Sequence, residues 1–149
     1  YVARDYLENA IILDGDQIIH NERILTSEFC QSGYNSVWTS EETDEWLQTV
    51  KDGIVTACSR VGGKCGWQLY SISRWTAEDG RKLKKHLELE FEQRHHTQIY
   101  WDDIVMFCHP EEYQLGIFEM QADDVIEIDS LDELIDLDNS YECFREKEE

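Results

Sequence analysis

The feature that most constrains the fold is a run of β-type sequence between residues 45 and 73 that is divided by two glycine-containing turns. "EWLQTV" leads through "KDG" into "IVTACSRV", and "GGKCG" then leads into "WQLYSIS". Asp-Gly between two such segments is a strong hairpin signal, because the tight turn needs positive φ at its central positions. A phosphate-binding loop could also use the later glycines, but no helix start with GK[ST] follows. We therefore expect consecutive antiparallel strands.

Helical and strand patterns mix on both sides of this run. We expect a helix over residues 1–8 and strands at 10–13, 34–40, 114–120 and 125–129. Thr76 with an acidic residue three positions later begins a helix in which Leu83, Leu87 and Phe91 share one apolar face. Ser130 with Glu133 opens a second, short helix. The order indicates an α/β or α+β domain with a mixed sheet.

The chain length suits one domain, and the charge limits its partners. We expect residues 1–149 to form a single domain with a flexible acidic tail at about 139–149. The 33 acidic and 13 basic residues give a net charge of −20, which disfavours binding to nucleic acid or anionic lipid. Five cysteines without a CxxC pair, and no apolar run of membrane length, favour a cytoplasmic protein with reduced thiols and no membrane insertion.

Three acidic motifs end or adjoin predicted strands: "LDGD", "YWDD" and "EID". Strand ends at one edge of a sheet bring side chains together, and Mg²⁺ prefers carboxylate oxygens completed by phosphate and water. A magnesium ion held by Asp16 and Asp129 would also let an acidic chain accept a nucleotide. Each motif taken alone is also typical of a turn or a helix cap, and Asp129 directly precedes the predicted cap at Ser130.

Several aromatic residues lie close to acidic ones in the sequence. Trp46, Trp75, Tyr100 and Trp101 are of this kind. Aromatic faces beside a carboxylate suit a quaternary ammonium group, which has no N–H to donate. Each tryptophan taken singly is better explained as a core residue or a cross-strand partner in a hairpin.

The ordered set of motifs resembles the bacterial CTP:phosphocholine cytidylyltransferases, within the nucleotidyltransferases that include the sugar-1-phosphate nucleotidylyltransferases. The segments are "YLENAIILDGDQII", "TDEWLQTV", "SRWTAEDGRKL", "YWDDIV" and "VIEIDSLDEL". "YWDD" followed by "EIDS" about 25 residues later is the most specific part. The resemblance covers residues 5 to 138. It implies an α/β fold with a Rossmann-like mixed sheet of the nucleotidyltransferase type, truncated at the N-terminus, and an antiparallel β excursion.

The resemblance also implies an activity and a set of site residues. The activity is Mg²⁺-dependent transfer of CMP from CTP to phosphocholine, giving CDP-choline and pyrophosphate. Asp16 and Asp129 match the catalytic, metal-binding aspartates of the family. Other matching positions surround the choline ammonium in the family, and Tyr100 is added from the aromatic residues named above. The predicted substrate-binding residues are Trp46, Trp75, Tyr100, Asp102 and Glu127.

The sequence departs from the family pattern before Asp14. No G-x-G-x-R loop, which holds the base and triphosphate in the family, stands in the 13 residues that precede it. We therefore expect the C-terminal portion of a cytidylyltransferase, inactive alone, with an exposed sheet edge suited to a homodimer. Two alternatives stay open: an enzyme for another aminoalkyl phosphate or a sugar 1-phosphate, and a non-catalytic acidic interaction module.

Overall fold

The computed structural model describes residues 1–145 and contains a six-stranded mixed sheet in the order β1-β6-β3-β7-β5-β4, as well as a two-stranded ladder of β2 with β8. The strands are β1 (Ala10–Ile12), β2 (Gln17–Ile19), β3 (Gly33–Thr43), β4 (Leu47–Lys51), β5 (Ile54–Ser59), β6 (Gly63–Trp75), β7 (Gly116–Glu119) and β8 (Val125–Glu127). The helices are α1 (Ala77–Glu88), α2 (Trp101–Asp103) and α3 (Leu131–Leu137). The predicted α/β class is confirmed.

The predicted antiparallel excursion is present as β4, β5 and β6. Its first turn has φ values of 53° at Asp52 and 80° at Gly53, as a tight hairpin requires. β6 pairs with β3 along most of its length and also with β4. The sheet is therefore curved, and the edge strand β4 contacts β6 as well as β5. β7 joins β3 in parallel, which makes the sheet mixed.

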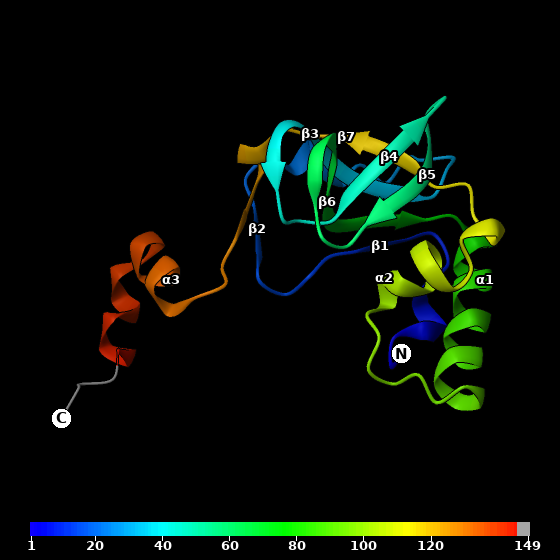
Figure 1. The fold of residues 1–149 in the computed structure, drawn as a ribbon. Coiled ribbons are helices and arrows are strands. Elements are labelled where there is room, and N and C mark those ends of the chain that lie inside the picture. The colour runs from blue at the N-terminus through cyan, green and yellow to red at the C-terminus, as the bar shows by residue number, and fades with distance from the viewer. Residues whose placement is uncertain (146–149) are drawn as a thin grey trace.

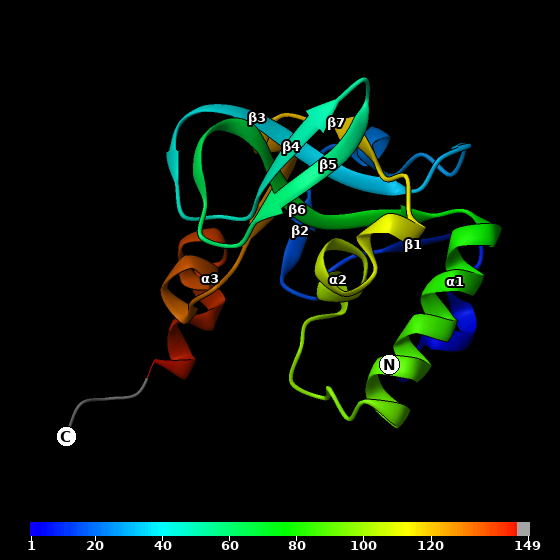
Figure 2. The ribbon, with the colours of Figure 1, turned by 45° about the vertical axis from the view of Figure 1, so that its right-hand side comes forward.

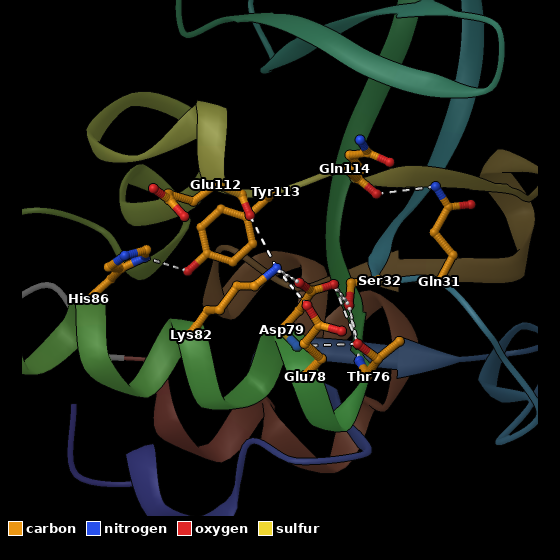
Figure 3. Close-up of polar contacts among 10 residues, drawn as sticks. All are labelled: Gln31, Ser32, Thr76, Glu78, Asp79, Lys82, His86, Glu112, Tyr113 and Gln114. Carbon is orange, nitrogen blue, oxygen red and sulfur yellow. Dashed lines mark hydrogen bonds and ion pairs between the residues drawn. The ribbon is translucent and has the colours of Figure 1, made fainter.

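The helix predicted from Thr76 is α1, and the sheet holds its first turn in place. The Thr76 hydroxyl accepts the Asp79 backbone N–H at 3.2 Å, while Ser32 at the start of β3 donates to the Asp79 carboxylate at 2.7 Å (Figure 3). Leu83 and Leu87 are buried in the core. α1 and α2 lie together on one side of the sheet, and α3 stands apart from them in both views (Figures 1 and 2).

Two π-helical turns continue the helices, and the motif "YWDD", which was expected to end or adjoin a strand, lies in α2 instead. η3 (Leu89–Gln93) continues α1, and η4 (Ile104–Cys108) continues α2. In each, a backbone N–H reaches the carbonyl five residues back, as Arg94 does to Leu89 at 3.0 Å. The loop that connects the two helices thus lies between η3 and α2, and η4 follows α2.

Single 3₁₀ turns complete the chain: η1 (Arg4–Tyr6), η2 (Glu22–Leu25), η5 (Pro110–Glu112), η6 (Ala122–Asp124) and η7 (Asn139–Phe144). The helix predicted over residues 1–8 is reduced to η1, since Asn9 takes a positive φ of 52° just before β1. The predicted acidic tail begins with η7, and its residues 146–149 lie outside the described part of the chain. Within residues 1–145, no helix has the length and apolar character needed to cross a membrane.

Candidate functional site

One pocket of about 280 Å³ gathers four of the predicted substrate-binding residues. Its lining is Asp14, Glu45, Trp46, Leu69, Ser71, Tyr100, Trp101, Asp102 and Glu127. These residues come from the end of β1, the start of β4, the middle of β6, the N-terminal end of α2 and the end of β8. The volume lies just below the range of about 300–1,000 Å³ that is usual for drug-sized ligands, so a small molecule suits it.

Aromatic rings form one wall of the pocket. Trp46 meets Tyr100 edge to face, with ring centroids 6.3 Å apart, and meets Phe107 in the same way at 5.4 Å. Tyr100 is 73% exposed, so its ring stands at the mouth of the pocket. Trp101 stacks on the buried Tyr34 at 6.1 Å. In this wall Trp101 is therefore packed against the core, and Tyr100 is exposed.

Asp102 is the buried carboxylate of the pocket. It accepts a hydrogen bond from the Tyr34 hydroxyl at 2.5 Å. Burial raises its pKa to about 7, against the opposing effect of the Tyr34 hydrogen bond, and the negative charges of Asp14 and Asp103 add to the rise. A cation in the pocket would favour the ionised form of this group.

Glu127 is the second predicted carboxylate, and it lies among other acids. Burial raises its pKa, the hydrogen bond from Gln17 at 2.8 Å lowers it, and the charges of Glu45, Asp129 and Asp16 raise it again. The pocket lining contains four carboxylates and no lysine or arginine. The carboxylates are those of Asp14, Glu45, Asp102 and Glu127. The side chains that line the pocket therefore carry negative charge without a basic partner among them.

Asp16 and Asp129, the predicted metal ligands, lie beside this pocket and not in it. The β2–β8 ladder pairs Gln17 with Glu127, and the Asp16 carbonyl accepts the Ile128 N–H at 2.9 Å. Both aspartates are exposed at the same end of that ladder, next to Glu127. Residues 1–145 contain no group of three or more His, Cys, Asp or Glu placed to hold a metal ion. Two carboxylates fit Mg²⁺, which takes the rest of its shell from phosphate and water.

Trp75 does not line the pocket. It is fully buried, with edge-to-face contacts to Tyr34, Trp101 and Tyr113, and its indole N–H donates to Ser73 at 2.9 Å. Its place is behind Trp101, as a support for the aromatic wall. The motif "SRW" alone does not reveal which face of β6 the tryptophan occupies.

Several residues of the site were not among the predicted substrate-binding ones, among them Glu45, Ser71 and Tyr34. Glu45 directly precedes Trp46, and this adjacency was the available signal. Ser71 lies on β6, two residues from Leu69, so the two-residue period of a strand puts both on the pocket face. Tyr34 required knowledge of the fold, because its partner Asp102 is 68 residues away.

Comparisons with known proteins agree with this architecture. No family model matches the chain. A 2-aminoethylphosphonate cytidylyltransferase from Lancefieldella rimae is 28% identical over 143 residues, which cover 95% of this chain and 58% of the relative. A choline-phosphate cytidylyltransferase from Streptococcus pneumoniae is 24% identical over 131 residues, which cover 88% of this chain and 56% of the relative. The chain therefore spans less than three fifths of the length of these two curated relatives.

A solved structure gives the same result for the fold. The CTP:phosphocholine cytidylyltransferase from Streptococcus pneumoniae (LicC) superposes with a TM-score of 0.79 and 23% identity, covering 94% of this chain and 60% of that one. The predicted resemblance is confirmed in sequence relatives and in fold. The chain is a relative of the cytidylyltransferases and has their nucleotidyltransferase fold.

Proposed function

We propose that this chain acts in a cytidylyltransferase that moves CMP from CTP to an acceptor bearing both a phosphate and an ammonium group, with phosphocholine as the first candidate. The products would be CDP-choline and pyrophosphate. The observation that carries the proposal is the 280 Å³ pocket, in which aromatic rings and four carboxylates converge without a basic side chain.

The chemistry of the pocket matches an ammonium ligand better than a sugar. A quaternary ammonium group gains from aromatic faces and from negative charge, whereas sugar hydroxyls need directional hydrogen-bond partners. Trp46 and Tyr100 offer ring surface, and Asp102 and Glu127 offer the charge. An acceptor held by its ammonium end would extend its phosphate out of this acidic pocket.

Asp16 and Asp129 are the proposed ligands of a cation that would supply the counter-charge for that phosphate. Mg²⁺ bound by these two carboxylates would neutralise phosphate oxygens. The transfer itself would be an attack by an acceptor phosphate oxygen on the α-phosphorus of CTP. One P–O bond forms, the bond to the β-phosphate oxygen breaks, and pyrophosphate leaves. Such transfers depend on positioning and charge and need no covalent nucleophile.

A second acceptor, 2-aminoethylphosphonate, has its own support. The relative from Lancefieldella rimae is a 2-aminoethylphosphonate cytidylyltransferase. A primary ammonium group has three N–H donors, and the four carboxylates of the pocket supply acceptors for them. Aromatic ring surface favours the quaternary ammonium of phosphocholine, and carboxylate acceptors favour the primary ammonium of 2-aminoethylphosphonate.

The decisive test is the binding of choline to the chain, measured by calorimetry, with Trp46→Ala as the variant. We expect the parent to bind choline and W46A to bind it at least about tenfold more weakly, since a desolvated cation–π contact contributes on the order of 2 kcal/mol. The matched control is Trp38→Ala: Trp38 is 53% exposed on β3 and absent from the pocket lining.

Each result has a clear meaning. Binding by the parent and by W38A, but not by W46A, supports the ammonium pocket. Preference for 2-aminoethylphosphonate over phosphocholine in the same assay would favour the second acceptor. A folded parent that binds neither choline nor either acceptor, with or without Mg²⁺, would refute the proposal and favour the acidic interaction module.

A further inference from the structure

The pocket residues of α2 belong to a chain segment that is attached to the sheet along its middle, by the hydrogen bond from Tyr34 to Asp102 and the ion pair of Arg60 with Asp103, and also at its two ends. We call residues 97–108 the pocket segment: it follows η3, carries Tyr100, Trp101 and Asp102, and ends with η4. Residues 97–100 have no regular secondary structure. The attachment of the two ends adds to these contacts in setting the position of the pocket wall.

Both ends of the pocket segment meet at one buried side chain, Glu90. Its carboxylate is fully buried, with His96 Nδ1 at 2.8 Å from Oε2 and His109 Nε2 at 2.8 Å from Oε1. Arg94 donates to the same Oε1 at 2.6 Å. We call Glu90, Arg94, His96 and His109 the Glu90 cluster. It joins the residue before the segment to the residue after it.

The far end of the cluster is packed against α1 as well. The ring of His109 stacks on His86 with centroids 3.9 Å apart and 6° between the planes. His86 in turn contacts the Tyr113 hydroxyl at 2.7 Å (Figure 3). The end of the segment at His109 is thus held by α1 and by Glu90. Its start is attached to Glu90 through the half-exposed side chains of His96 and Arg94, and through the His96 N–H, which donates to the Glu90 carbonyl at 2.9 Å.

The cluster has no contact with the pocket itself, since none of its members is in the pocket lining. We propose that Glu90 is a positioning residue of the ammonium pocket: by joining His96 to His109 it closes the pocket segment and fixes Tyr100, Trp101 and Asp102 in the wall. The choice of ligand in this inference rests on the proposed function. The positioning role rests on the hydrogen bonds of Glu90.

The electrostatics fit a structural anchor that stays ionised. Burial raises the pKa of Glu90, but hydrogen bonds from His109 and His96 and the charge of Arg94 outweigh it and leave the pKa below its ordinary value. A buried carboxylate with several charge-assisted hydrogen bonds is expensive to replace, because its partners then lose their acceptor. π-turns at both ends of the segment are also typical of functional sites.

The test combines hydrogen exchange with choline binding in Glu90→Gln, at a temperature where the variant is folded. We expect amide exchange in peptides covering residues 97–108 to rise at least about tenfold, with the β4–β5 hairpin unchanged, because the loss is local. Choline should bind E90Q about tenfold more weakly. The matched control is Glu88→Gln, which removes the ion pair with Arg4 from the same helix and should change neither readout.

The two readouts separate the two proposals. Unchanged exchange in residues 97–108 of folded E90Q overturns the positioning role, whether or not choline binds. Faster exchange throughout the protein also overturns it, since Glu90 would then stabilise the whole fold. Faster local exchange in E90Q, with no choline binding by the parent, keeps the anchor and refutes the proposed function. If E90Q does not fold, His96→Ala serves instead. It removes only the hydrogen bond between Glu90 and the half-exposed His96, and should give a smaller increase in exchange over the same residues.

Discussion

At the scale of single residues, Asp102 has the most informative chemistry. Its carboxylate is 7% exposed, has one hydrogen bond from Tyr34, and has a pKa of about 7. Near neutral pH the empty pocket therefore holds a mixture of the protonated and ionised forms. Binding of a cation shifts this mixture toward the ionised form and releases a proton.

This leads to a prediction for stability. The folded-state pKa of Asp102 lies above its ordinary value of 3.8, so the native state keeps a proton that the unfolded chain has lost. Stability should fall as pH rises from about 4 to about 7, by up to about 4 kcal/mol at 1.36 kcal/mol per pH unit. Asp102→Asn removes this contribution. Urea unfolding of both proteins across that range measures the difference; curves that stay parallel would contradict the prediction.

The same residue shows how far sequence reasoning reaches at a site. The motif "YWDD" singled out Asp102 and Tyr100, and both line the pocket. Burial of Asp102 and its raised pKa could not be predicted, since the burial depends on the tertiary fold and outweighs the hydrogen bond from Tyr34, which lowers the pKa. The sequence does not single out Glu90, because a glutamate in a charged helix is normally exposed. Its burial and its contacts with Arg94, His96 and His109 depend on the fold.

At the scale of elements, local signals predicted what local interactions decide. The Asp52-Gly53 turn and the cap at Thr76 are specified within a few residues, and both are present. The place of β7 is different, because it depends on non-local contacts. It lies between β3 and β5, parallel to β3, and 82 residues of chain lie between the paired Gly33 and Gly116. Strand patterns alone do not encode that order.

The contact between β3 and β7 gives a prediction at this scale. A Cβ on Gly33 would stand 2.2 Å from the Gly116 carbonyl oxygen, so Gly33→Ala must separate the two strands. We expect a loss of about 3 kcal/mol in the free energy of unfolding, the upper end for overpacking. Gly53→Ala is the control: it has open space but a φ of 80°, and should cost only about 1 kcal/mol. Equal losses in urea unfolding would count against the close strand contact.

At the scale of the whole molecule, the net charge of −20 sets the conditions for any anionic substrate. The ammonium end of an acceptor is attracted and its phosphate end is repelled. Asp16 and Asp129 add to that repulsion unless a cation lies between them and the phosphate. The proposed magnesium requirement is therefore a property of the whole charge distribution as well as of two side chains.

We accordingly expect Mg²⁺ to strengthen binding of phosphocholine but not of choline. The double variant Asp16→Asn with Asp129→Asn should lose the Mg²⁺ effect and keep choline binding. Asp132→Asn, which removes an exposed carboxylate from α3, is the control. Calorimetry at constant ionic strength, balanced with NaCl, separates a bound ion from general screening. An Mg²⁺ effect that survives in the double variant would exclude these aspartates as its ligands.

The position of β7 in the middle of the sheet also determines how the chain can acquire its structure. β3 and β5 precede β7 in the chain: β3 lacks the partner on one edge until Gly116–Glu119 is available, and β5 lacks its pairing at Ile54 until Gly116 is available. During synthesis the nascent chain therefore carries two open edges that invite pairing with other chains. Completion of the sheet is a late, non-local step, so folding of this small domain should be slow for its size.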